Sequence, residues 1–230
     1  MRQDPQAVML FAAGFGTRMG ALTKDCPKPL LRVADKTLLD HALELAQGIA
    51  PKTCVVNAHY KHEQITQHLS GSGVRVSIEA PDILDTGGGL RQALPLLGNG
   101  PVYTSNTDAV WQGPNPFELL KSAWNPDIMD ALLLCVPQKN AVGYTRGGDF
   151  QLDQEGRLSR GPGTVYTGVQ ILKTDRLSTI EDESFSLNVV WDQIQKEARL
   201  FGLIYPGTWC DVGTPEGITL AEEMLENSHV

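Results

Sequence analysis

The fold is decided by a stretch near the amino terminus, residues 7–30, which reads AVMLFAAGFGTRMGALTKDCPKPL. Its first six residues are apolar and partly β-branched or aromatic, which is typical of a short buried strand. Glycines at positions 14, 16 and 20 follow at once, together with two spaced cations, Arg18 and Lys28. A strand that ends in a glycine loop with nearby cations predicts a phosphate-binding site.

The residue types of the loop explain this prediction. Gly14 and Gly16 carry no Cβ, so the loop can adopt positive φ angles and bring backbone N–H groups close to phosphate oxygens. Arg18 offers a planar fork to two oxygens, whereas Lys28 is a compact charge that can follow a phosphate as it moves. The prolines on either side hold Lys28 in a stiff segment, because each fixes its own φ and restricts the preceding residue.

Two familiar phosphate loops do not match this stretch. Its glycines are spaced GxGxxxG rather than the GxGxxG of a dinucleotide fold, and a basic residue, Arg18, lies inside the loop. The chain contains no GxxxxGK[ST] sequence. A plain glycine turn with incidental surface cations is the remaining alternative, and the combination of Arg18, Lys28 and the paired prolines disfavours it.

Residues 10–30 resemble the signature of the sugar-1-phosphate nucleotidylyltransferases, or nucleotide-sugar pyrophosphorylases. That pattern is approximately L-A-[AG]-G-x-G-[TE]-R-[ML]-x-P-L-T-x-x-x-P-K-P-L, and this chain departs from it at Phe11 and Ala21. The resemblance implies a nucleoside triphosphate and a sugar 1-phosphate as substrates, with Mg²⁺ as cofactor. It also implies nucleotide contacts from the loop residues Ala12, Ala13, Gly14, Gly16 and Thr17.

Length and composition indicate one soluble domain. The 230 residues suffice for a single α/β core and show no shift in composition. We expect one domain, 1–230, in which the resemblance makes 1–130 mainly nucleotide-binding and 131–230 mainly sugar-binding with the second metal ligand. The formal charge of −8 argues against nucleic acid or an anionic membrane as partner. Four widely spaced cysteines and an amino terminus without a signal pattern favour a cytoplasmic location, and we expect a monomer or small homo-oligomer.

Strand and helix patterns alternate along the chain. We expect strands over 7–12, 53–57, 74–78, 102–105, 131–136, 143–146, 150–152, 165–172 and 200–205, and helices over 38–49, 63–69, 87–94, 187–198 and 215–225. This order predicts an α/β fold, a Rossmann-like, mostly parallel sheet flanked by helices, with binding loops at the carboxyl ends of its strands. The resemblance names it the nucleotide-diphospho-sugar transferase fold and adds a strand-rich sugar-binding subregion.

Two aspartates are candidate metal ligands. Asp108 follows an apolar strand, and Asp211 lies in the segment 207–216, GTWCDVGTPE. Mg²⁺ prefers hard oxygen ligands and usually takes one or two protein carboxylates. Judged from their positions alone, both aspartates can equally serve to cap turns or helices. The resemblance assigns them to the metal, because 106–108 matches the family's [NG]-x-D motif and 209–215 matches its second aspartate motif.

The remaining ligand contacts also follow from the resemblance. The segment 84–88, LDTGG, is similar to the L-x-T-G-G that lines the family's nucleotide pocket, which suggests Thr86, Gly87 and Gly88; a flexible lead-in to a helix is the alternative. Sugars need a few directional polar groups on an apolar wall. The sugar-binding candidates are Asn106, Gly143, Gly168 and Asn188, although Asn106 can instead orient Asp108 and Asn188 can cap a helix.

The predicted reaction is in-line attack of a sugar-1-phosphate oxygen on the α-phosphorus of the triphosphate. Arg18 neutralises the leaving pyrophosphate and Lys28 holds the α-phosphate and the incoming phosphate. Residues 185–192, FSLNVVWD, look like the N-acetylmuramate-1-phosphate uridylyltransferase branch, which makes UTP the expected donor. Mannose-1-phosphate guanylyltransferases share much of this run. A phosphocholine-type cytidylyltransferase and a non-catalytic regulatory subunit also stay open as interpretations.

Overall fold

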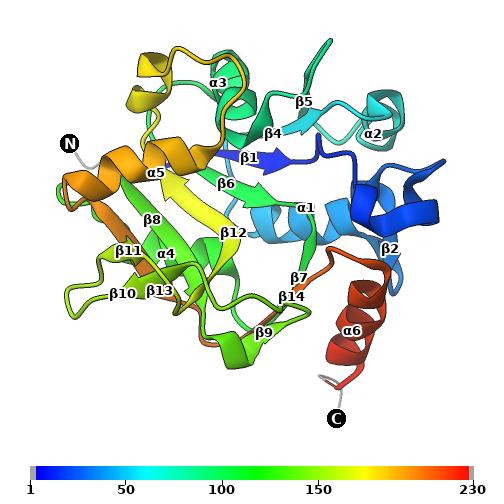
Figure 1. Cartoon of the computed structure of the whole chain (residues 1–230). Helices are drawn as coiled ribbons and strands as arrows, with labels where there is room; N and C mark the ends of the chain where they lie inside the picture. Colours follow the sequence, from blue (N-terminus) through cyan, green and yellow to red (C-terminus); the bar gives the residue numbers. More distant parts are fainter. Residues whose placement is uncertain (1–3, 228–230) are drawn as a thin grey trace.

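A seven-stranded sheet forms the centre of the molecule (Figure 1). The computed structural model describes residues 4–227, and residues 1–3 and 228–230 lie outside it. The strand order is β13-β8-β12-β6-β1-β4-β5. The strands are β1 (Ala7–Phe11), β4 (Thr53–Ala58), β5 (Arg75–Ile78), β6 (Val102–Asn106), β8 (Ala131–Val136), β12 (Val165–Leu172) and β13 (Leu200–Ile204).

Most neighbouring strands of this sheet run parallel. β5, β4, β1 and β6 pair in parallel, and so do β13 and β8. β12 is antiparallel to both β6 and β8, so it is the reversed strand of the sheet as described. The predicted mostly parallel α/β fold is therefore confirmed. Because parallel strands place their carboxyl ends at one edge, the loops after β1, β4 and β6 meet there.

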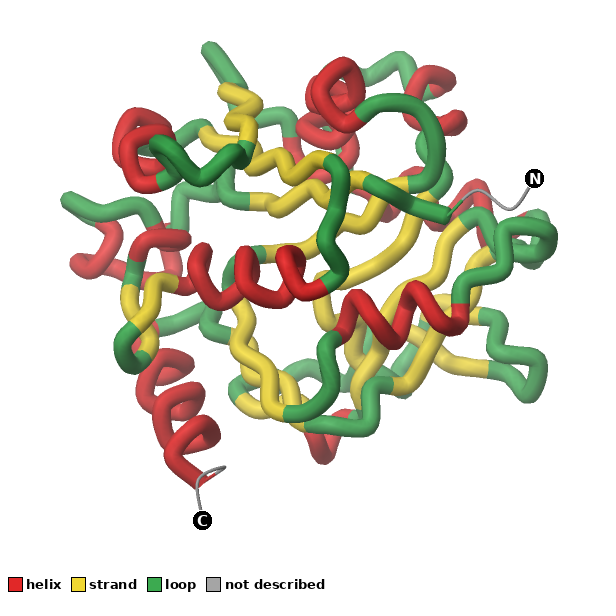
Figure 2. Tube along the Cα trace, turned by 180° about the vertical axis from the view of Figure 1, so that it is seen from behind, coloured by secondary structure: helices red, strands yellow, loops and turns green. Residues whose placement is uncertain are grey.

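Helices cover both faces of the sheet, as the two opposite views show (Figures 1 and 2). The alternation within β1 produces this arrangement, because Val8 and Leu10 face one core while Ala7 and Met9 face the other. The first core contains α1 (Leu38–Gly48), α2 (His62–His68) and α4 (Pro116–Ala123). The second contains α3 (Asp85–Leu97) and α5 (Leu187–Lys196).

Smaller elements surround the carboxyl edge of the sheet. A three-stranded sheet, in the order β7-β14-β9, joins distant parts of the chain and is followed by the closing helix α6. Its members are β7 (Ala109–Gln112), β9 (Ala141–Val142), β14 (Thr208–Asp211) and α6 (Pro215–Glu226). Two strand pairs and four 3₁₀ helices complete the fold: β2 (Arg32–Val33), β3 (Lys36–Thr37), β10 (Phe150–Leu152), β11 (Leu158–Arg160), η1 (Thr17–Thr23), η2 (Lys28–Leu30), η3 (Gln138–Asn140) and η4 (Asp175–Thr179).

Most expected elements match the structure to within one residue at each end, and three differ by more. Helix α3 begins at Asp85 and continues through Pro95 to Leu97, because a proline in the last turn removes few intrahelical bonds. The strand expected over 143–146 is absent: Gly143 adopts φ +76° and turns the chain away after β9. Helix α5 ends at Lys196 rather than at residue 198. None of the described helices combines the length and apolarity needed to cross a membrane.

Asp130, directly before β8, holds together three chain segments at the edge opposite the loops. Its carboxylate oxygens lie 2.9 Å from Lys173 Nζ, 2.9 Å from Arg199 Nε and 3.2 Å from Arg176 Nη2, and its side chain is only 13% exposed. Burial alone would raise the pKa of Asp130, but hydrogen bonds from these three cations outweigh that effect and lower it.

We expect Asp130→Asn to lower the free energy of unfolding by about 2–4 kcal/mol at neutral pH, since it leaves three cations without their common carboxylate. The lowered pKa makes this contribution fully present above the unfolded-state pKa of about 4 and lost as the pH falls through the folded-state value. Urea unfolding of both proteins across the acid range tests this. Asp127→Asn, at an exposed carboxylate that forms no ion pair with residues 4–227, should match the wild type; a pH-independent deficit in Asp130→Asn would contradict the explanation.

Candidate active site

Two adjoining cavities open at the carboxyl ends of β1 and β6. Each has a volume of about 310 Å³. The first cavity is lined by the glycine loop, by Lys28 and by the ends of β4 and β5; the second is lined by β10 to β12, α5 and β14. Their common wall consists of Phe11, Arg18, Asp85, Thr86, Asn106 and Asp108. Residues of the loops at 13–28 and 106–108 thus share one crevice with Asp85 and Thr86, whereas the glycines at 87–89, which we expected to face it as well, do not line it.

The glycine loop forms one side of the first cavity, with Ala12, Ala13, Gly14, Gly16 and Thr17 all in its lining. Gly16 has φ +65° and begins η1. A Cβ at this position would lie 2.8 Å from the Cβ of Lys28, so glycine is what permits the PKP segment to approach the loop. Gly14 does not adopt a positive φ; open space lies where its side chain would be.

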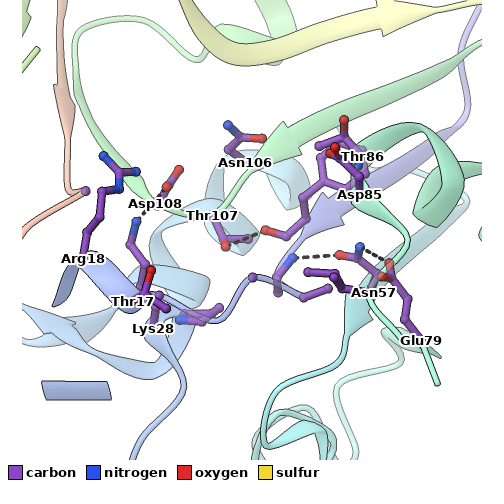
Figure 3. A pocket seen from close by; sticks show the side chains of 18 residues that line it. Thr17, Arg18, Lys28, Asn57, Glu79, Asp85, Thr86, Asn106, Thr107 and Asp108 are labelled. Atoms are coloured by element: carbon purple, nitrogen blue, oxygen red, sulfur yellow. Dashed lines mark hydrogen bonds and ion pairs between the residues drawn. The ribbon is translucent and has the colours of Figure 1, made fainter. Parts of the chain in front are cut away.

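The two predicted cations occupy different positions in the crevice (Figure 3). Lys28 is buried, and its Nζ lies 2.7 Å from Oδ2 of Asp108. Arg18 is exposed on the common wall, beside the backbone of Gly213, and makes no hydrogen bond or ion pair with residues 4–227. Arg18 is therefore available to a ligand directly, whereas Lys28 is available once Asp108 has another partner.

Asp108 and Asp211 are brought together by the pairing of β7 with β14. In the antiparallel register Asp211 lies opposite Ala109, and the N–H of Val212 donates to the carbonyl of Asp108 at 2.8 Å. Burial raises the pKa of Asp211, and the carboxylate of Asp108 raises it further, against the lowering effect of nearby cations. The two carboxylates therefore interact electrostatically across the second cavity.

This pair of carboxylates suits Mg²⁺, because the ion accepts one or two protein carboxylates and leaves its other positions to phosphate and water. No cluster of three or more His, Cys, Asp or Glu side chains that would form a larger metal centre occurs within 4–227. The mutual repulsion that raises the pKa of Asp211 is what a divalent cation would relieve.

A buried polar network that the sequence analysis missed supports the loop (Figure 3). The N–H of Ala12 donates to Oδ1 of Asn57 at 2.7 Å, and Nδ2 of Asn57 donates to Oε1 of Glu79 at 2.6 Å. The other carboxylate oxygen of Glu79 accepts the N–H of Leu84 at 2.7 Å. These bonds connect the loops that follow β1, β4 and β5. The position of Asn57 at the end of an apolar strand was the available signal.

The segment at the start of α3 lies differently from expectation. Thr86 lines both cavities, but Gly87 and Gly88 line neither. Their N–H groups donate to the carbonyl of Phe185 at 2.8 and 3.1 Å, and a Cβ on Gly87 would collide with the Phe185 ring. The two glycines therefore allow the segment before α5 to approach α3, and Asp85 and Thr86 are the residues of this segment that face a ligand.

The candidate sugar contacts also separate into two groups. Asn106 lies on the common wall, and Gly168, at a bulge of β12 with φ +88°, leaves room for it: a Cβ there would lie 2.8 Å from Asn106 Nδ2. Asn188 lines the second cavity and donates to Ser186 Oγ at 2.9 Å; Ser186, not Asn188, is the N-cap of α5. Gly143 lines neither cavity and instead packs against the backbone of Asp211.

The second cavity contains several side chains that the sequence analysis did not select. Tyr166 and Trp191 meet edge to face, with ring centroids 4.9 Å apart, and give the cavity an apolar surface. Charged side chains surround this surface: Arg146, Asp149 and Arg160. Their positions depend on the loop between β9 and β10 and on the β10–β11 hairpin, which carry no local motif.

An α/β sheet whose first strand delivers a glycine-rich loop, beside two cations and two neighbouring carboxylates, fits the class that the sequence predicted, a nucleotidyltransferase. The chain belongs to the MobA-like NTP transferase domain family, whose model matches residues 8–145. The predicted family and enzyme class are therefore confirmed.

Curated relatives extend over almost the whole chain. It is 35% identical to N-acetylmuramate alpha-1-phosphate uridylyltransferase of Caulobacter vibrioides, over 98% of this chain and 99% of the relative. The protein of the same name from Neisseria meningitidis is 32% identical over 90% of this chain and 92% of its own length. D-glycero-alpha-D-manno-heptose 1-phosphate guanylyltransferase of Campylobacter jejuni is 25% identical over 92% and 96%.

Solved structures confirm the fold. HddC from Yersinia pseudotuberculosis, complexed with GMP-PN, has a TM-score of 0.77 at 21% identity, covering 96% of this chain and 99% of that one. A UDP-glucose pyrophosphorylase complexed with UDP-glucose has a TM-score of 0.80 at 16% identity, covering 97% and 99%. At these identities the similarity concerns the arrangement of the backbone.

We expect Asn57→Ala to lower the free energy of unfolding by about 1–3 kcal/mol, because it leaves the Ala12 N–H and Oε1 of the buried Glu79 without their hydrogen-bond partner. The same change frees the glycine loop, so nucleotide affinity should fall as well. Urea unfolding and calorimetric titration with a nucleoside triphosphate measure the two effects. Asn125→Ala, at an exposed turn, is the control; equal behaviour of the two variants would show that the network does not support the loop.

Proposed function

We propose that the protein transfers a uridylyl group from UTP to N-acetylmuramate 1-phosphate, forming the nucleotide sugar and releasing pyrophosphate. The observation that carries this proposal is that the cavity lined by the glycine loop adjoins the cavity lined by aromatic side chains at Asp108. Lys28 lies beside Asp108 at this junction and can bind a phosphate group. The relatives from Caulobacter vibrioides and Neisseria meningitidis, both above 30% identity, share the name that contains this donor group and acceptor.

The two cavities suggest where each substrate binds. The triphosphate fits the first cavity, against Ala12, Ala13, Gly14, Gly16 and Thr17, with Thr86 nearby; the sugar fits the second, beside Asn106, Gly168 and Asn188. Apart from Gly213, the first cavity is lined within 11–108, which supports the expected role of 1–130 in nucleotide binding. We therefore assign Gly87, Gly88 and Gly143 to support of the site rather than to ligand contact.

The reaction needs positioning and neutralisation of charge rather than a protein nucleophile. An oxygen of the sugar 1-phosphate forms a bond to the α-phosphorus as the bond to the β-phosphate oxygen breaks, and pyrophosphate leaves with that electron pair. Arg18 donates to the β- and γ-phosphate oxygens, and Lys28 donates to the α-phosphate between the two cavities. Asp108 and Asp211 would hold Mg²⁺, which when bound supplies positive charge to the phosphates.

The thiols support the expected cytoplasmic location. Cys26, Cys54, Cys135 and Cys210 are all free. Burial raises the pKa of Cys54 to about 11 and that of Cys210 to about 12, so these thiols stay protonated and unreactive. Free buried cysteines are typical of a reducing compartment.

Pyrophosphate release measured over a matrix of triphosphates and phosphorylated acceptors tests the proposal. We expect the highest kcat/KM for UTP with N-acetylmuramate 1-phosphate. Preference for GTP with mannose or heptose 1-phosphate would assign a guanylyltransferase instead, and dependence on CTP and phosphocholine would assign a cytidylyltransferase. Absence of turnover with every pair would identify a non-catalytic subunit.

We expect Asp108→Asn and Lys28→Ala each to lower kcat by about 100-fold or more, because each removes a charged group at the reacting phosphate. Lys24→Ala removes an exposed lysine from the same segment and should leave kcat within about twofold. Thermal unfolding of all three variants verifies the fold. Full activity in either of the first two folded variants would overturn the assigned roles.

A further inference from the structure

One cation of the second cavity has no assigned task. Arg146 and Arg160 both line this cavity, away from the glycine loop. Arg160 is already engaged: its Nε and Nη2 lie 3.0 and 2.9 Å from Oδ1 of Asp192, and its guanidinium lies 4.8 Å from the ring centroid of Phe150. Arg146 makes no hydrogen bond or ion pair with any residue from 4 to 227.

The loop that carries Arg146 is fixed on both sides. At its start, Gly143 packs so closely on the neighbouring strand β14 that a Cβ would lie 2.8 Å from a backbone oxygen. At its end, the carbonyl of Gly147 accepts hydrogen bonds from Nε2 of Gln138 at 2.8 Å and from the N–H of Gly163 at 3.2 Å. Arg146 is therefore held at the cavity by a short, anchored turn, which reduces the entropy that binding would cost.

The carboxylate of Asp149 does not pair with Arg146. Asp149 also lines the cavity, but Oδ1 accepts the hydroxyl of Tyr144 at 3.1 Å and Oδ2 accepts the N–H of Tyr166 at 2.9 Å. In a chain of formal charge −8, an anionic ligand group enters such a cavity only where a cation receives it.

N-acetylmuramate differs from N-acetylglucosamine by a lactyl ether on the 3-oxygen, whose carboxylate is ionised at neutral pH. This carboxylate is a second anionic group, separate from the 1-phosphate. Arginine binds carboxylates through two parallel hydrogen bonds, so one free guanidinium is a sufficient receptor. Arg18 lies on the common wall and is assigned to the triphosphate, which leaves Arg146 as the cation of the second cavity without a partner.

We infer that Arg146 binds the lactyl carboxylate of N-acetylmuramate 1-phosphate and thereby selects this sugar over N-acetylglucosamine 1-phosphate. This inference rests on the proposed function. The aromatic surface of Tyr166 and Trp191 then serves the part that the two sugars share. Arg146 acts on substrate choice, and the reacting phosphates remain with Arg18 and Lys28.

The test compares kcat/KM for the two sugar phosphates, with UTP held constant, in the wild type, Arg146→Gln and Arg146→Lys. We expect Arg146→Gln to lower kcat/KM for N-acetylmuramate 1-phosphate roughly 10- to 100-fold, mainly through KM, because a charge-assisted hydrogen bond is lost. The loss for N-acetylglucosamine 1-phosphate should be much smaller. Arg146→Lys keeps the charge without the fork and should restore part of the preference.

Arg157→Gln is the matched control, since Arg157 pairs with Asp153 and Glu155 on the β10–β11 hairpin and lines neither cavity of the site. This variant should retain the wild-type ratio of kcat/KM for N-acetylmuramate 1-phosphate to kcat/KM for N-acetylglucosamine 1-phosphate. Equal losses for both sugars in Arg146→Gln would place Arg146 on the 1-phosphate, and an unchanged ratio would remove it from the site; either result overturns the inference. A wild type that does not prefer N-acetylmuramate 1-phosphate would instead refute the proposed function.

Discussion

The pairing of β14 with β7 is the contact on which the site depends. It places Asp211, from near the carboxyl end, beside Asp108, which follows the sixth strand of the chain. Neither carboxylate has a fixed relation to the other without this ladder. The same ladder brings α6 into place after β14 and sets Gly213 beside Arg18. A few backbone hydrogen bonds therefore determine where negative and positive charges meet at the crevice.

Buried polar contacts fix the loops relative to one another, just as the β7–β14 ladder fixes the two aspartates. Asn57 and Glu79 hold three loop ends at fixed distances, in an interior where an unpaired polar group is costly. Thr86 plays a related part, because its Oγ1 accepts the N–H of Leu187 and so connects α3 to α5. Buried hydrogen bonds thus hold the elements around the crevice in place. A fixed arrangement of this kind is needed to align two substrates for in-line attack.

The sequence predicted features whose cause is local and missed those whose cause lies elsewhere in the chain. Residues 7–30 contain the strand and the left-handed Gly16, as predicted, whereas Gly14 does not adopt a positive φ and η1 and η2 were not predicted. Helix α4 was missed, although the shorter helix α2 was predicted. Gly87 and Gly88 looked like ligand contacts, yet Phe185, remote in sequence, occupies their N–H groups. The environment of Arg146 likewise depends on Gln138 and Gly163, which no spacing rule relates to it.

The ion pair between Lys28 and Asp108 has a thermodynamic consequence. A cation that takes over Asp108 releases Lys28, and an anion that takes over Lys28 releases Asp108. Each ligand therefore removes part of the cost of binding the other, and by linkage the benefit is the same in both directions. Because the pair is close to neutral, a lone cation or a lone anion must break it unaided. Ligands that arrive as a neutralised couple, such as a triphosphate with its counter-ion, gain the most from this arrangement.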